Sequence, residues 1–181
     1  MMDDLERRIR RLEAESQIRQ LIARYCFTID DRDHDGIAAL FTDDATVTSA
    51  DGVMNATGID AIMAQYAGRF TVLGAGAHFM HDVVLDIGDG DEATGRVSGH
   101  AELWRRDQMM VCSIRYKDRY RRVADRWLFA AREISFLYYV PLSEYAGILG
   151  KRDRNLAYGD PRPADFPEGL PGWAAQAAAS G

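Results

Sequence analysis

Apolar residues in the first part of the chain recur every three or four positions, as they do along one face of an amphipathic helix. The pattern is clearest at Ile18, Leu21, Ile22 and Tyr25. Side chains at this spacing share one face of a helix. We therefore expect a long first helix over residues 3–28.

Two shorter helices and a hairpin are expected next. Asp33 is suited to cap the first of these helices, because a side-chain oxygen before a helix accepts hydrogen bonds from its first free amides. This helix would carry Ile37, Leu40 and Phe41. The remaining elements are a hairpin of residues 45–49 and 53–55 around Asp51-Gly52, and a helix that opens at Thr57-Gly58.

The second half of the chain changes to the two-residue alternation that is typical of β-strands. The four expected strands cover residues 78–87, 93–105, 109–122 and 126–140. We interpret Gly74-Ala75-Gly76 as a turn before the first of them. Helices followed by antiparallel strands predict an α+β fold.

The third expected strand has one dry and one charged face. Its basic face carries Arg115, Lys117, Arg119 and Arg121. Such a face is more typical of a solvated or dimer-facing sheet than of a nucleic-acid site. We expect a homodimer or homotrimer that associates through the outer sheet.

The prolines divide the chain. All five lie beyond Val140, and proline removes a backbone donor and restricts φ, so regular structure should thin out there. We expect residues 1–140 to form one folded domain. Residues 141–181 would form a tail that closes the pocket, wraps the body or is partly disordered.

Composition narrows the partners and the compartment. The formal net charge of −6 disfavours nucleic acid and anionic membrane surfaces as partners. No apolar run approaches the roughly 20 residues that span a bilayer, and the charged N-terminus lacks the apolar core of a signal peptide. Cys26 and Cys112 lie among apolar neighbours and are expected to be buried thiols in a cytoplasmic protein.

The order of these elements and several short motifs resemble the SnoaL-like (nuclear transport factor 2-like) family. The motifs are Tyr-Cys-Phe-Thr-Ile-Asp at 25–30, Leu-Phe-Thr-Asp-Asp-Ala at 40–45, Ala-His-Phe at 77–79 and Trp-Leu-Phe-Ala-Ala-Arg at 127–132. The resemblance implies a cone-shaped α+β barrel. Helices would pack inside a curved antiparallel or mixed sheet and enclose an apolar pocket.

Within this superfamily the pattern is similar to scytalone dehydratase, the bile-acid dehydratases and the lindane dehydrochlorinase. The resemblance implies a site made of Asp30 at the end of the first helix, His78 opening a long strand and Arg132 on the last strand. Tyr25 matches a tyrosine of the dehydratases. The dehydrochlorinase has a lysine at that position, so Tyr25 argues against dehydrochlorination.

These residue types suit elimination of water beside a carbonyl. A histidine with a pKa near neutrality can remove the α-proton, and a carboxylate can orient it. We expect His78 to be the base, Asp30 its partner, and Arg132 and Tyr25 donors toward the oxygen atoms. The expected function is a cofactor-independent dehydratase for a small apolar, cyclic, steroid- or polyketide-like carbonyl compound.

Two groups of alternative functions stay open at this point. An isomerase or a cyclase would use the same pocket without losing water. A ligand-binding module, or the small subunit of a ring-hydroxylating dioxygenase, would use no chemistry at all. A metal site is not expected, since His78, His81 and Asp82 do not share one face of a strand.

Each of these candidate site residues can also be explained by a purely structural role. Asp30 can be a capping carboxylate, Tyr25 can be a core side chain, and Arg132 can pair with a carboxylate such as Asp30. Apolar alternation along residues 79–87 turns His78 away from the core and favours His81, unless a bulge lies near Met80-His81. We expect Ala101 to lie beside His78, with the adjacent His100 facing away.

Overall fold

The described part of the chain, residues 2–179 of this computed structural model, contains four α-helices, six strands and one 3-10 helix. Positions 180 and 181 of the expected tail lie outside the described residues. The elements follow the order α1 (Met2–Asp30), α2 (His34–Ala38), β1 (Phe41–Ser49), β2 (Asn55–Thr57), α3 (Ile59–Phe70), β3 (Leu73–Ile87), β4 (Glu92–Arg105), β5 (Gln108–Val123), β6 (Arg126–Pro141), η1 (Leu142–Gly150) and α4 (Pro171–Ala179).

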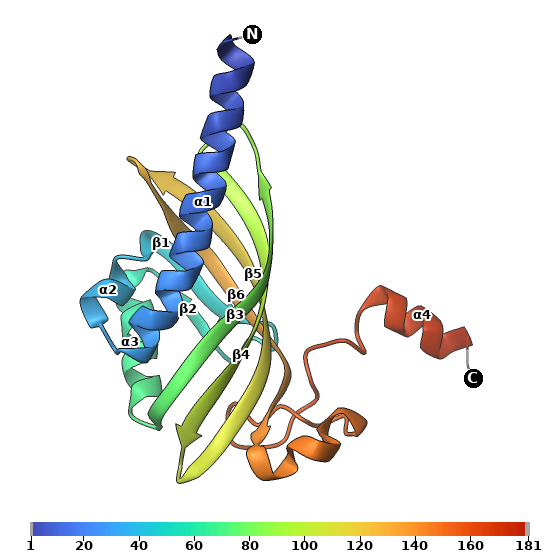
Figure 1. The fold of residues 1–181 in the computed structure, drawn as a ribbon. Helices are drawn as coiled ribbons and strands as arrows, with labels where there is room; N and C mark the ends of the chain where they lie inside the picture. The colour runs from blue at the N-terminus through green and yellow to red at the C-terminus, as the bar shows by residue number, and fades with distance from the viewer. Residues whose placement is uncertain (1, 180–181) are drawn as a thin grey trace.

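The six strands form one curled sheet in the order β2-β1-β6-β5-β4-β3. The β1–β6 pair is parallel and the other pairs are antiparallel. Figure 1 shows the sheet wrapping around α1 without closing, so β2 and β3 remain edges. The predicted α+β class and cone-like form are confirmed, with an open sheet in place of a closed barrel.

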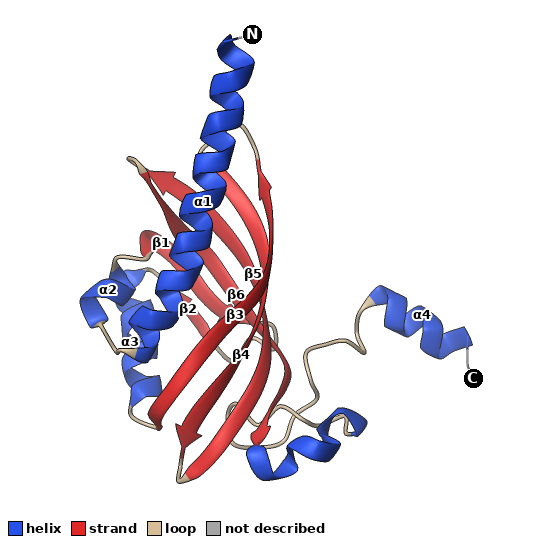
Figure 2. Cartoon of the chain, viewed as in Figure 1, coloured by secondary structure: helices blue, strands red, loops and turns tan. Residues whose placement is uncertain are grey.

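Helix α1 lies against the concave face of the sheet and packs mainly on β3 and β6 (Figure 2). The predicted stripe is correct, because Ile18, Leu21, Ile22 and Tyr25 are all buried. The helix continues beyond the predicted end at residue 28. Asp30 therefore stands in its last turn, facing β3.

The predicted second helix was too long. Asp33 caps α2 as expected, accepting a hydrogen bond from the backbone of Gly36 at 3.0 Å. However, α2 ends at Ala38, and β1 already begins at Phe41. The backbone oxygen of Leu40 accepts a bond from Phe129 of β6, so pairing with the sheet overrides the helical spacing. The hairpin partner, β2, is also shifted to Asn55–Thr57.

The glycines before His78 lie within β3 and do not form the predicted turn. A Cβ atom at Gly76 would lie 2.6 Å from Leu103 Cδ2 and 2.9 Å from the Glu102 oxygen. Glycine is therefore needed at this position for close packing against β4, a role that sequence spacing does not distinguish from a turn.

A register shift between Met80 and Val83 interrupts the β3–β4 ladder. This bulge resolves the conflict in the apolar alternation, because it changes which face each side chain occupies. On its N-terminal side His78 reaches α1. On its C-terminal side Val83 and Leu85 pack against the core.

The segment after β6 folds back onto the sheet. Arg154 is buried there and donates hydrogen bonds to the backbone oxygens of Leu137 and Phe166 and to the carboxylate of Glu168. Helix α4 stands away from the sheet (Figure 1). Among the described helices, none combines the length and apolar character needed to cross a membrane.

Candidate active site

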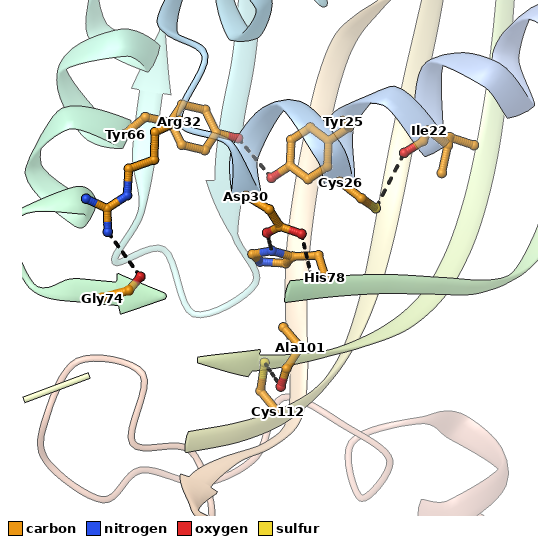
Figure 3. Close-up of polar contacts among 10 residues, drawn as sticks. All are labelled: Ile22, Tyr25, Cys26, Asp30, Arg32, Tyr66, Gly74, His78, Ala101 and Cys112. Carbon is orange, nitrogen blue, oxygen red and sulfur yellow. Dashed lines mark hydrogen bonds and ion pairs between the residues drawn. The ribbon is translucent and has the colours of Figure 1, made fainter. Parts of the chain in front are cut away.

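The last turn of α1 and the start of β3 bring Asp30 and His78 together (Figure 3). His78 Nδ1 lies 2.6 Å from Asp30 Oδ1, and the backbone N–H of His78 donates to Asp30 Oδ2 at 2.8 Å. The side chains are 8% and 20% exposed, respectively. These two contacts, in a place with little access to solvent, fix both the position of His78 and the orientation of its ring.

The carboxylate also selects the histidine tautomer. An ionised carboxylate only accepts hydrogen bonds, so the proton of a neutral His78 ring belongs on Nδ1. Nε2 is then a free lone pair, and it has no hydrogen-bond partner among the described residues. A histidine held in this way can act as a general base, because the carboxylate stabilises its conjugate acid.

Tyr25 lies one turn before Asp30 on the same helix, and its hydroxyl is 3.0 Å from the hydroxyl of Tyr66 on α3 (Figure 3). Both tyrosines are buried. Burial, followed by the proximity of Tyr25, raises the pKa of Tyr66 well above its usual value. Tyr66 therefore stays protonated and can donate to Tyr25, which leaves the Tyr25 proton available to another acceptor.

Arg132 lies in the core and not on an open wall. Its Nε and Nη2 donate to the two oxygens of Asp118 at 3.0 and 2.8 Å, and both side chains are essentially inaccessible. Three rings, those of Tyr25, Tyr116 and Phe129, lie 4.0–4.2 Å from its guanidinium carbon. Asp118, and not Asp30, is thus the carboxylate partner. Nη1 is buried without a hydrogen bond.

The ion pair keeps Arg132 charged inside the core. Burial alone disfavours the cation, but Asp118 offsets this, and the pKa of Arg132 stands well above its ordinary value. A permanent positive charge therefore lies against the ring of Tyr25, at 4.2 Å.

A cavity of about 320 Å³ opens between α3, the adjoining ends of β3, β4 and β6, and the tail. Its walls are largely apolar, and Ala157 and Tyr158 of the tail contribute to them. Neither Asp30 nor His78 is part of this wall. The connection to the buried tyrosines is Arg69, which lines the cavity and interacts electrostatically with Tyr25 and Tyr66.

The other histidines occupy different places. His81 and His100 stack on each other, with Nε2 and Nδ1 2.7 Å apart, in a partly exposed groove away from Asp30. Ala101 pairs with His78 across the β3–β4 ladder, as expected. In the described residues, no group of three histidine, cysteine or acidic side chains is arranged to hold a metal.

Sequence reasoning missed two residues of this region. Asp118 falls on the same alternation as the buried Tyr116 and Tyr120 of β5. An acidic residue on a dry face was therefore a readable signal for a buried arginine partner. Tyr66 has apolar helical spacing with Ile62 and Met63, but spacing within one helix cannot show that its hydroxyl meets a second helix.

Several solved structures share this fold. A type 2 hexachlorocyclohexane dehydrochlorinase has 20% identity and a TM-score of 0.67, covering 73% of this chain and 90% of that one. A scytalone dehydratase-like protein from Novosphingobium aromaticivorans has 22% identity and a TM-score of 0.66, covering 76% and 91%. A protein of unknown function from Mycobacterium tuberculosis has 27% identity and a TM-score of 0.64, covering 76% and 78%.

The first two likenesses, at their level of identity, establish a common fold. No curated protein matches the sequence significantly. The model of the SnoaL-like domain matches residues 10–133, well over half of the chain, and the protein therefore belongs to the SnoaL-like domain family.

Proposed function

We propose that this protein is a cofactor-independent lyase that removes water from a hydroxylated cyclic carbonyl compound. The contact of 2.6 Å between Asp30 and His78, with the ring Nε2 left unpaired, carries the proposal. The names of the dehydratase- and dehydrochlorinase-like relatives support the same class of reaction.

The proposed reaction moves one proton. His78 Nε2 takes the proton from the carbon beside the carbonyl, and Asp30 stabilises the imidazolium that forms. Tyr25 donates a hydrogen bond to the carbonyl oxygen as negative charge develops there. The C–O bond of the neighbouring hydroxyl then breaks, and His78 returns the proton to the leaving oxygen, so that a double bond and water are formed.

Arg132 is assigned a positioning role in this scheme. Two of its nitrogens are held by Asp118, and its guanidinium is enclosed by aromatic rings. We therefore assign the donation to the carbonyl to Tyr25. The guanidinium of Arg132 lies 4.2 Å from the centre of the Tyr25 ring and helps to hold that ring in position.

The proposed substrate is a small apolar compound with a ring. A cavity volume of about 320 Å³ lies at the lower end of the range for small-molecule sites. Because neither Asp30 nor His78 lines this cavity, we propose that it holds the apolar part of the substrate and that the reacting carbons extend beyond its wall toward His78. Since Ala157 and Tyr158 line the cavity, we propose that the tail after residue 141 closes it over the substrate. Association into a homodimer or homotrimer through the outer sheet is part of the same proposal, and light scattering tests it.

The experiment is a screen of hydroxylated cyclic ketones followed by mass analysis of the product. A product lighter by one water, formed by the unmodified protein and lost in His78→Ala, is the expected result. His81→Ala is the matched control, because it removes a histidine from the same strand outside the site. A product of unchanged mass would show an isomerase or cyclase instead. Full turnover in both His78→Ala and Asp30→Asn would show that the site is misassigned.

A further inference from the structure

The cavity beside α3 has a largely apolar wall, but this wall also carries positive charge and hydrogen-bond donors that have no matching acceptor among the described residues. Arg69 and Arg105 both line it, together with Gln65. We propose that this cavity binds the carboxylate group of an apolar acid, with Arg69 as the principal partner. The inference goes beyond the proposed function, since it requires binding and no reaction.

Within residues 2–179, the part of the chain that the structure describes, Arg69 has no carboxylate partner. Among the described residues, its one hydrogen-bond contact is with the sulfur of Met54, 3.6 Å from Nη1. A thioether is a weak acceptor and carries no charge. An arginine cannot lose its proton at ordinary pH, and a partly buried cation without a counter-charge is costly. The side chain therefore lies where an anion would be stabilised.

The tyrosines near Arg69 do not supply the missing charge. Its positive charge interacts with Tyr25, Tyr66, Tyr116 and Tyr139. Burial raises the pKa of Tyr66, Tyr116 and Tyr139, so these three hydroxyls are neutral at physiological pH. They leave the charge of Arg69 uncompensated.

Two further donors belong to the same wall. Gln65 Nε2 and Arg105 Nε are both buried and both lack a hydrogen-bond partner. Arg105 uses Nη1 to bind the backbone oxygens of Leu156 and Ala157, at 3.2 and 2.6 Å, and not a carboxylate. Among the described residues that line the cavity, none is acidic. Two side chains of this wall thus carry buried donors without an acceptor, beside the uncompensated charge of Arg69, although unpaired buried donors are normally rare.

The remainder of the wall selects for an apolar body. It includes Met54, Val72, Leu73 and Phe136. A fully hydrated anion such as inorganic phosphate would gain little from these side chains, whereas a ring that carries one carboxylate would contact both parts of the wall. The ligand class is therefore an aromatic or alicyclic carboxylic acid.

The test uses isothermal titration calorimetry to compare the binding of a carboxylic acid with that of the corresponding uncharged amide. The probes are 2-naphthoate against 2-naphthamide, and the smaller pair benzoate against benzamide. For at least one pair we expect the acid to bind about tenfold or more tightly than the amide, as charge-assisted hydrogen bonds normally allow. Arg69→Met should remove this preference and leave the amide affinity nearly unchanged.

Two controls make the result specific. Arg126→Met removes an equal charge from the exposed β5–β6 turn and should leave acid binding intact. His78→Ala should also leave it intact while abolishing turnover, which separates this inference from the proposed reaction. Inorganic phosphate should bind weakly or not at all.

The proposal is wrong if neither acid is preferred to its amide in the unmodified protein, or if phosphate competes equally well. It is also wrong if folded Arg69→Met, checked by its circular dichroism and melting curve, keeps the preference. If Arg69→Met fails to fold, Gln65→Leu serves as the second variant. The proposal would be contradicted if Gln65→Leu kept the full preference for the acid over the amide and bound the acid no more tightly than phosphate.

Discussion

The carboxylate of Asp30 contacts both the ring and the main chain of His78, at 2.6 and 2.8 Å. Strand β3 is an edge of the sheet, so its outward backbone N–H groups have no strand to bind. Asp30 satisfies one of these groups and orients the imidazole at the same time. One side chain thus joins helix to sheet and fixes the orientation of the imidazole.

Asp30→Asn should separate these two effects. The amide oxygen can still accept the backbone N–H of His78, so the fold should be retained, but the NH₂ group cannot accept a proton from Nδ1. The proton should then move to Nε2, which would no longer act as a base. We expect turnover to fall by about 10²–10⁴-fold. Nitrogen-15 NMR of the imidazole should show the tautomer change, and the exposed neighbour Asp31→Asn should show neither effect.

The Arg132–Asp118 pair should be important for stability. Arg132→Met leaves a buried, unpaired carboxylate, and we expect a loss of about 3–5 kcal/mol in the free energy of unfolding by urea. Adding Asp118→Asn should recover part of this loss, because no charge is then unpaired and Tyr120 keeps an acceptor. Arg122→Met breaks an exposed pair with Asp91 and should cost about 1 kcal/mol or less. Equal losses for the two arginine variants would contradict this assignment.

Replacement of Gly99, which pairs with Met80 beside the β3 bulge, should lower the stability of the protein. A Cβ atom there would lie 2.7 Å from the backbone oxygen of Phe79 and 2.9 Å from the sulfur of Met80. The backbone cannot move aside without disturbing the register that presents His78, so Gly99→Ala should destabilise the protein by about 1–3 kcal/mol. Gly90→Ala, where the added atom meets nothing within 4 Å, is the control. Matching denaturation curves for the two variants would rule out the proposed close packing.

Cys112 should be inert as a thiol in the folded protein. Burial raises its pKa to about 12, and the thiolate is the reactive form. Because the folded pKa lies above the unfolded value, the contribution of this thiol to stability is fully present below pH 9 and is lost as the pH rises toward 12. Labelling with Ellman's reagent at pH 8 should occur at this thiol only after unfolding. The variant Cys26→Ala isolates it, and rapid labelling of native Cys26→Ala would disprove the burial effect.

Much of the architecture follows from patterns of short range. The stripe at Ile18, Leu21 and Ile22 identified α1, and strict alternation identified the four long strands, because each signal depends only on neighbours within one element. The sequence-based predictions failed where contact with another element determined the local secondary structure. Phe41 has helical spacing with Ile37, but pairing with Phe129 draws it into β1.

The candidate site shows the same division. Family resemblance singled out Asp30 and His78, and both residues lie together in the structure. Alternation alone would have chosen His81, because a bulge of the kind between Met80 and Val83 leaves no local mark in the sequence. The partner of Arg132 was open for a related reason, since a buried charge requires a partner but does not specify which one.

By itself the sequence determined which faces are apolar, which segments are helices or strands, and which residue types carry chemistry. Tertiary structure brings Asp30 against His78, as the family resemblance implied, and it alone decided that Asp118 neutralises Arg132 and that Arg69, Gln65 and Arg105 share one cavity. The physical reason is distance along the chain. Helical and strand periodicities act between near neighbours, whereas these contacts depend on how a curled sheet brings separate elements to one place.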